Sequence, residues 1–140
     1  MNRIARLLVM AAFAASLASC GVQQSIDDAK AEISTFHADL DARNFDAIWD
    51  EVAPDMRSAT QKSQFVAILE AVNRKLGRVV GSKQVGWNSN VSTSGSFVTV
   101  TMETKFQKGS GVETFIYRKV EDDRLALAGY NIQSQEMMLN

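Results

Sequence analysis

The chain has 140 residues but only one cysteine, one proline and one histidine. A single cysteine excludes a fold held by internal disulfides, because each disulfide needs two cysteines. One proline and a formal net charge of −1 exclude a disordered or collagen-like chain, which would be richer in proline, glycine or net charge. The near balance of 15 basic and 16 acidic residues offers no basic surface for nucleic acid. The composition, 46% hydrophobic, instead fits one compact domain.

The first residues have the pattern of an export signal. Arg3 and Arg6 precede an uncharged, mostly apolar run over residues 7–18, and small residues follow. As a helix this run would be about 18 Å long, which is shorter than a bilayer core of roughly 30 Å. We therefore expect residues 1–19 to be a signal peptide and not a permanent membrane span.

The apolar run ends in Leu17-Ala18-Ser19-Cys20. This sequence resembles the lipobox of bacterial lipoproteins, in which an aliphatic residue and two small residues precede the cysteine that is lipidated. The resemblance implies a lipid anchor on Cys20 and also accounts for an unpaired thiol in an exported chain; the alternative is an ordinary secreted protein. In many Gram-negative lipoproteins an aspartate directly after the cysteine retains the protein in the inner membrane, whereas here this residue is Gly21. The resemblance therefore implies an anchor in the outer membrane, with the protein facing the periplasm.

After this lipidated cysteine and a short tether, residues 20–24, we expect one domain over residues 25–140. Ser25 and Asp28 have the capping-box spacing and predict a helix that starts there. Apolar residues at helical spacing predict helices near residues 25–43, 46–53 and 60–76, the second ended by Pro54 and the third capped by Thr60 and ended at Gly77. In the third helix one apolar stripe is expected to be buried: Phe65, Ile68, Leu69, Val72 and Leu76.

After residue 77 the hydrophobic period changes from 3.6 to 2. Alternating residues predict strands over residues 78–87, 97–106, 112–120 and 125–132, joined by short turns. Helices followed by strands with short connections indicate an α+β fold, in which N-terminal helices pack on a curved, mainly antiparallel four-stranded sheet.

The predicted domain also carries a second resemblance, in short segments spread over roughly residues 30–135. These segments are Phe45-Asp46-Ala47-Ile48-Trp49, Ala53-Pro54, Leu76-Gly77 and Leu127-Ala128-Gly129-Tyr130-Asn131-Ile132. They resemble a family of small exported bacterial proteins known only as a domain of unknown function. The resemblance implies a cystatin-like, or nuclear-transport-factor-two-like, cone fold. Relatives of that fold include isomerases and dehydratases as well as domains without chemistry.

The one histidine is the strongest catalytic candidate. His37 and Asp41 are four residues apart in the first predicted helix, so an imidazole and a carboxylate could meet on one helical face as a general base and its orienting partner. The alternative is a structural pair on a helix that is rich in acids. No serine lies in a G-x-S-x-G elbow that would supply a nucleophile.

Metal and cofactor sites find little support in the sequence. The acids near residues 39–51 fail the EF-hand pattern, because Arg43 falls at a ligand position and Asn44 where glycine is required. With Cys20 lipidated, zinc would have only His37 as a ligand. The glycines at residues 109–111 precede a strand and lack a dinucleotide fingerprint. We expect neither a metal nor a cofactor.

Aromatic and sulfur-containing side chains could line a pocket inside such a cone, or could simply fill the core. The candidates are Trp49, Trp87, Met102, Phe115, Tyr117 and Tyr130. The sequence thus supports two hypotheses. The first is a lipid-anchored, non-catalytic domain that binds a protein partner or a small apolar ligand. The second is a small isomerase, dehydratase or hydrolase that uses His37 and Asp41.

Overall fold

The computed structural model describes residues 2–139 and, of these, the side chains of residues 20–139. The predicted signal peptide, residues 1–19, thus lies outside the residues whose side chains are described. The elements in chain order are α1 (Asn2–Asp41), α2 (Phe45–Asp50), α3 (Pro54–Ala59), α4 (Lys62–Leu76), β1 (Val79–Ser92), β2 (Gly95–Phe106), β3 (Gly109–Lys119), a 3-10 turn (Glu121–Asp123), β4 (Leu125–Gln133) and α5 (Gln135–Met138).

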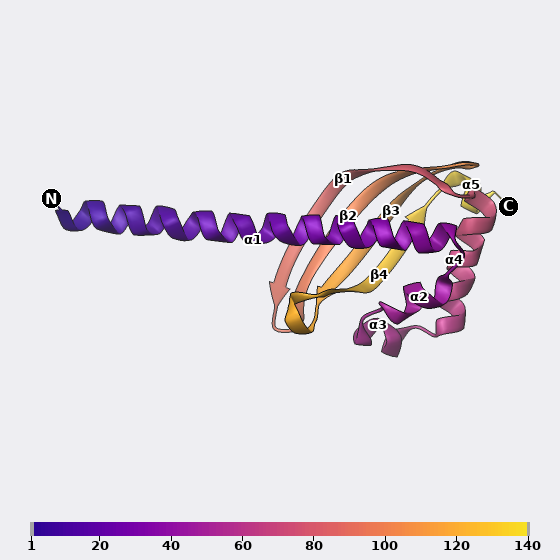
Figure 1. Cartoon of the computed structure of the whole chain (residues 1–140), viewed down its shortest axis with the longest axis horizontal. Coiled ribbons are helices and arrows are strands. Elements are labelled where there is room, and N and C mark those ends of the chain that lie inside the picture. The colour runs from indigo at the N-terminus through magenta and orange to yellow at the C-terminus, as the bar shows by residue number, and fades with distance from the viewer. Residues whose placement is uncertain (1, 140) are drawn as a thin grey trace.

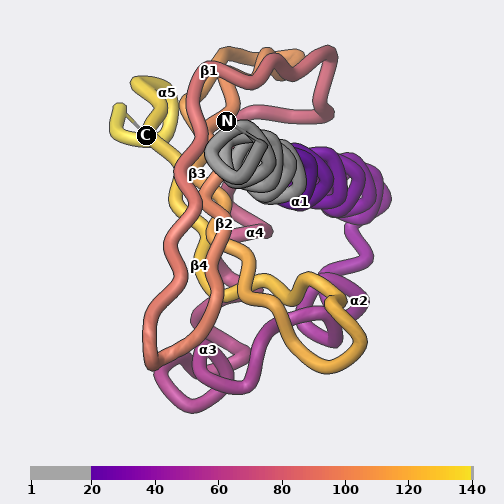
Figure 2. Tube along the Cα trace, turned by 90° about the vertical axis from the view of Figure 1, so that its left-hand side faces the viewer, coloured from indigo at the N-terminus to yellow at the C-terminus, as the bar shows by residue number. Residues whose placement is uncertain are grey.

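The four strands form one sheet in the order β1-β2-β3-β4, and each neighbouring pair is antiparallel. The sheet is curved, and α1 runs along its concave side while α4 stands at one end (Figure 1). Figure 2, viewed nearly along α1, shows this helix beside one face of the sheet. This arrangement confirms the predicted α+β class, with helices packed on a curved, antiparallel, four-stranded sheet.

The hydrophobic core fills the space between the concave face and the helices. Along β2, buried residues alternate with more exposed ones, which confirms the predicted period of two. The stripe of α4 is buried except at Ile68, which is 47% exposed. Ile68 lies to one side of the line that residues 65, 69, 72 and 76 make along the helix, so it faces away from the sheet. The largest fully buried side chains of the core are Phe106, Phe115, Ile33, Leu40, Leu69 and Leu76.

The first helix begins earlier than the sequence predicted. The Ser25 hydroxyl donates to the Gly21 carbonyl oxygen at 3.0 Å, which is the bond of a serine inside a helix and not of an N-cap. The predicted start of the helix at residue 25 is therefore wrong, because α1 runs continuously through residues 20–24. Within the described residues, no helix combines the length and the apolar character needed to cross a bilayer.

Three further boundaries differ from the prediction. Pro54 does not simply end a helix but occupies the first turn of α3, where its missing N–H has no intrahelical partner to lose. Thr60 does not cap α4, whose N-cap is Gln61 without a side-chain cap. β1 continues to Ser92, beyond the predicted end at residue 87. The predicted end of α4 is correct, because Gly77 follows it at φ 78°, a conformation that favours glycine.

The two edges of the sheet are treated differently. Leu127 of β4 pairs with Val52 in a parallel bridge, and its N–H and carbonyl groups bond to Glu51 and Ala53. In the described chain no strand pairs with the outer edge of β1, a strand of 14 residues. β1 has bulges near residues 79–81 and 84–86, and from residue 86 to its end it pairs with β2 in continuous register. The outer edge of β1 therefore leaves a long, regular run of backbone without a partner strand in the described chain.

Candidate functional site

The single histidine faces the sheet and not its predicted partner. His37 lies on the buried face of α1, and its Nε2 is 2.7 Å from Oε2 of Glu113. Asp41 lies at the end of α1, where its carboxylate accepts the backbone N–H of Val79 at 2.9 Å. The predicted pairing of His37 with Asp41 is therefore wrong. Each side chain instead contacts the sheet, because His37 points toward β3 and Asp41 toward the start of β1.

Glu113 is the centre of this buried site. It lies on the concave side of β3 with an exposed fraction of 0%. Its Oε2 also accepts the Thr104 hydroxyl at 2.5 Å, and its Oε1 accepts the Tyr130 hydroxyl at 2.7 Å. We call His37, Thr104, Glu113 and Tyr130 the Glu113 cluster. Its members come from α1, β2, β3 and β4, so one carboxyl group is bonded to a helix and to both neighbouring strands.

The hydrogen-bond directions in the cluster follow from its donors. Thr104 has one hydroxyl proton and gives it to Glu113, so the Ser82 hydroxyl, 2.8 Å from Thr104, must be the donor to Thr104. An ionised carboxylate only accepts, so His37 donates through Nε2–H. The network thereby extends to β1 through Ser82.

Burial and charge keep Tyr130 in its donor role. Burial raises the pKa of Tyr130 well above its usual value, and the neighbouring Glu113 raises it further by its charge and by accepting the hydroxyl proton. Burial is also the main reason why the pKa of Tyr117 is raised, with smaller contributions from Glu32 and Glu113. Both phenols therefore stay protonated at neutral pH.

Aromatic rings surround the Glu113 cluster. The Phe36 ring centre lies 5.1 Å from that of Phe115 and 4.9 Å from that of Tyr130, and Phe115 lies 5.8 Å from the His37 ring. Every fully buried side-chain nitrogen or oxygen in the described residues has a hydrogen-bond partner. Because Glu113 has no exposed surface, it can orient His37 and hold the helix to the sheet but cannot contact a substrate in this conformation.

Five of the six predicted pocket residues are placed in three environments. Trp49, Met102 and Phe115 are buried in the core, where Trp49 packs against Phe65 with ring centres 5.8 Å apart. Tyr130 is half-buried and belongs to the Glu113 cluster. Trp87, in contrast, is 53% exposed on edge strand β1. These residues form one predicted group because a sequence shows which side chains are large and apolar. It does not show which end of the sheet the helices leave uncovered.

Tyr117 lines a small cleft. This cleft lies where α1 and α2 meet β3 and β4, and its volume of about 20 Å³ holds roughly one water molecule. We call it the Tyr117 cleft. Its lining consists of Glu32, Thr35, Phe36, Asp39, Ile48, Glu51, Tyr117, Leu125 and Leu127. In the described part of the chain, no three His, Cys, Asp or Glu side chains gather as a metal site would require.

Sequence reasoning did not identify Glu113 or Thr104. The pattern that could have found them is the alternation of the strands, which places an acid and a threonine at inward positions of β3 and β2 between apolar neighbours. A charged residue at an inward position needs a partner, and the one histidine on the buried face of α1 is the natural candidate. What the sequence lacked was the strand register, which brings residues 104 and 113 together.

The two buried tyrosines provide a matched test of the cluster. Changing Tyr130 to Phe removes a donor to a fully buried carboxyl group, and we expect it to lower the free energy of unfolding by about 1–3 kcal/mol. Changing Tyr117 to Phe removes a hydroxyl without a partner, and we expect a change within about 0.5 kcal/mol. Urea unfolding followed by tryptophan fluorescence measures both. Equal losses in the two variants would contradict the role given to Tyr130.

Comparison with known proteins places the chain in a family. No curated protein matches it. A family model described as "Protein of unknown function (DUF4019)" matches residues 33–130. The matched segment contains all four residues of the Glu113 cluster and most of the Tyr117 cleft. Since the match covers more than half of the chain, the protein belongs to this family of proteins of unknown function.

Proposed function

We propose that this protein is a non-catalytic binding domain of the cell envelope, anchored by a lipid on Cys20 at the periplasmic face of the outer membrane. The lipobox resemblance of residues 17–20 supports the anchor, and the Cys20 side chain is exposed on α1. A stable anchor needs more than one acyl chain, which lipoprotein maturation supplies. The resemblance to cystatin-like cone proteins is part of the same proposal, and the curved sheet with helices on its concave side is consistent with it.

The binding part of the proposal depends on one observation, the exposed edge of β1. From residue 86 to residue 92 this edge has regular backbone, no partner strand in the described chain and no charged side chain. Trp87 and Val91 lie on one side of it and are 53% and 77% exposed. Natural edge strands are usually protected by charges, proline or bulges. An unprotected edge with exposed apolar side chains favours an extended segment of a partner protein that adds to β1 as a further strand.

Within the described residues, the interior of the domain has no apolar pocket large enough for a small-molecule ligand, which favours a protein partner bound at the surface. Drug-sized ligands occupy pockets of about 300–1,000 Å³ that are lined by apolar groups. The Tyr117 cleft holds only about 20 Å³, and Trp49, Met102 and Phe115 are packed within the core. Larger clefts of about 260–700 Å³ are open surface grooves whose linings include several charged and polar residues. We therefore assign the binding role to the surface of β1.

The state of the two candidate catalytic residues supports a non-catalytic role. His37 gives its Nε2–H to Glu113, and Asp41 accepts a backbone N–H of β1. Neither residue lines the Tyr117 cleft. The hydrogen bonds of both side chains therefore join the last turns of α1 to the sheet.

Changing Cys20 to Ser tests the anchor. We expect metabolic labelling with a fatty acid to mark the native chain and not the variant, because only a thiol can form the thioether. We also expect the variant to leave the detergent phase on phase separation. A Ser19→Ala change, which keeps a small residue at that position, should remain labelled. Equal labelling of the native chain and of the Cys20→Ser variant, or none of the native chain, would contradict lipidation at this residue.

A photo-crosslinking amino acid at residue 89 tests the binding edge. Ser89 lies between Trp87 and Val91 on the same side of β1, so we expect a discrete adduct with a partner protein in intact cells. Changing Trp87 to Lys should abolish the adduct by placing a charge on this surface. Changing Asn88 to Lys, which adds the same charge on the opposite side of the sheet, should leave it. An adduct that survives Trp87→Lys would mean that β1 does not bind in this way.

A further inference from the structure

The hydroxyl group of Tyr117 lacks a hydrogen-bond partner although its side chain is almost completely buried. Tyr117 is 3% exposed, and no hydrogen bond to its hydroxyl contributes to its raised pKa. Every fully enclosed side-chain oxygen in the described residues has a partner. The Tyr117 oxygen must therefore keep some open surface, and the surface that Tyr117 lines is the Tyr117 cleft.

A carboxylate without a partner lines the same cleft. Glu32 is half-buried, and burial is the main reason why its pKa is raised, followed by repulsion from Glu51. No hydrogen bond or ion pair of Glu32 is present among the described residues. The other two acids of the cleft are already engaged: Glu51 is 3.1 Å from Arg124, and Asp39 accepts from Asn44 at 3.3 Å. The strongest free acceptor in the cleft is therefore Glu32.

Most of the remaining walls of the cleft are apolar. Phe36, Ile48, Leu125 and Leu127 are all buried and pack in the hydrophobic core. The space of about 20 Å³ has room for roughly one water-sized group. A ligand for this cleft must therefore present a compact, positively charged head to Glu32, with the rest of the molecule outside the cleft.

We propose that the Tyr117 cleft binds the primary ammonium group of an alkyl amine. An ammonium group is close to a water molecule in size and has three protons to donate. Glu32 accepts one of them as a charge-assisted hydrogen bond, and the Tyr117 oxygen accepts a second. A guanidinium or a quaternary ammonium group is too large for this space.

The amine can come from two sources that share this chemistry. One is a free small alkyl amine, and the other is a lysine side chain of another protein. The site does not depend on the lipid anchor or on the β1 edge of the proposed function. Its lining comes from α1, α2, β3 and β4, whereas the proposed binding edge is on β1.

Titration of the full chain with butylammonium chloride, followed by backbone amide shifts in NMR spectra, tests the proposal. We expect saturable shifts at Thr35 and Leu125, which line the cleft. Tetramethylammonium has the same charge but no N–H and a larger head, so we expect binding at least about tenfold weaker. N-acetyl-lysine amide serves as the second arm. Binding at least as tight as that of butylammonium indicates a lysine source, and weaker binding indicates a free amine.

Two variants with a matched control locate the binding. Changing Glu32 to Gln should weaken butylammonium binding about tenfold, and Tyr117→Phe roughly threefold, because each removes one acceptor and little volume. Glu103→Gln, which removes an exposed carboxylate on the convex face, should leave the affinity unchanged. The proposal is overturned if Glu32→Gln binds as tightly as the native chain, if tetramethylammonium binds equally well, or if butylammonium gives no saturable shift.

Discussion

The structure depends on one buried carboxyl group that has to be satisfied. Glu113 lies on the concave side of the sheet with no exposed surface, where an unpaired charge would cost several kcal/mol. Donors from α1, β2 and β4 supply its three hydrogen bonds, and none of these donors is a neighbour in sequence. Satisfying Glu113 therefore requires that the helix lie across the sheet at one particular position. Apolar packing alone would tolerate small shifts of α1, but a hydrogen bond of 2.7 Å between His37 and Glu113 does not.

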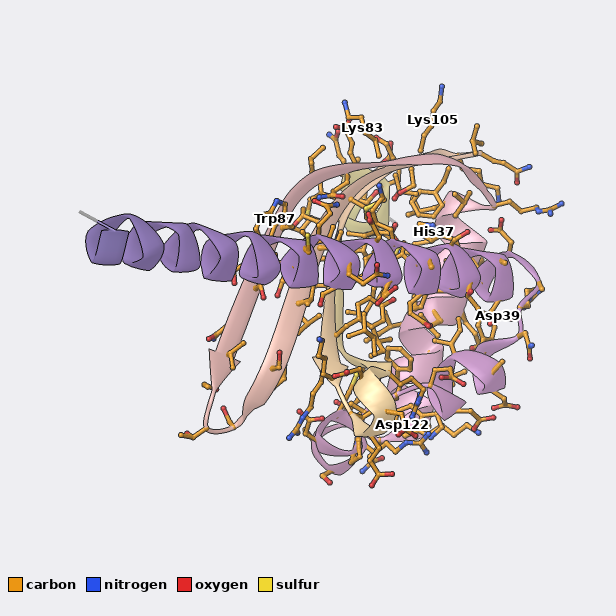
Figure 3. All side chains as sticks on the ribbon, turned by 60° about the vertical axis from the view of Figure 1, so that its left-hand side comes forward. His37, Asp39, Lys83, Trp87, Lys105 and Asp122 are labelled. Atoms are coloured by element: carbon orange, nitrogen blue, oxygen red, sulfur yellow. The ribbon has the colours of Figure 1, made fainter. Side chains whose placement is uncertain are left out.

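The same interaction determines which residues remain for function. His37, Asp41 and Glu113 are the groups that a catalytic interpretation would use, and all three are engaged in joining α1 to the sheet. The groups that stay available lie at the borders of the packed core. They are the unpaired edge of β1 with Trp87, and the unpartnered Tyr117 and Glu32 at the junction of the helices with β3 and β4. Figure 3 shows how different the convex face is, with Lys83 and Lys105 extending away from the sheet.

The fold could be predicted from the sequence further than the site could. Hydrophobic periods distinguish helix from strand, and Gly77 marks the change between them, so the α+β class and the strands were correctly expected. The early start of α1 was not, because Ser25 satisfies a capping pattern and an in-helix bond to Gly21 equally well. The pairing of His37 was missed for a different reason. Spacing along one helix suggested Asp41, whereas the real partner is 76 residues away and is brought near only by the packing of α1 on the sheet.

The free energy of unfolding of the Glu113→Gln variant tests the central claim most directly. A glutamine at this position presents an amide group to donors that need an acceptor, at a position with no exposed surface. We expect a loss of about 2–4 kcal/mol in urea unfolding, whereas Glu103→Gln on the exposed face of β2 should change stability by less than about 0.5 kcal/mol. If Glu113→Gln unfolds at the same urea concentration as the native chain, the buried carboxyl group does not hold this structure together.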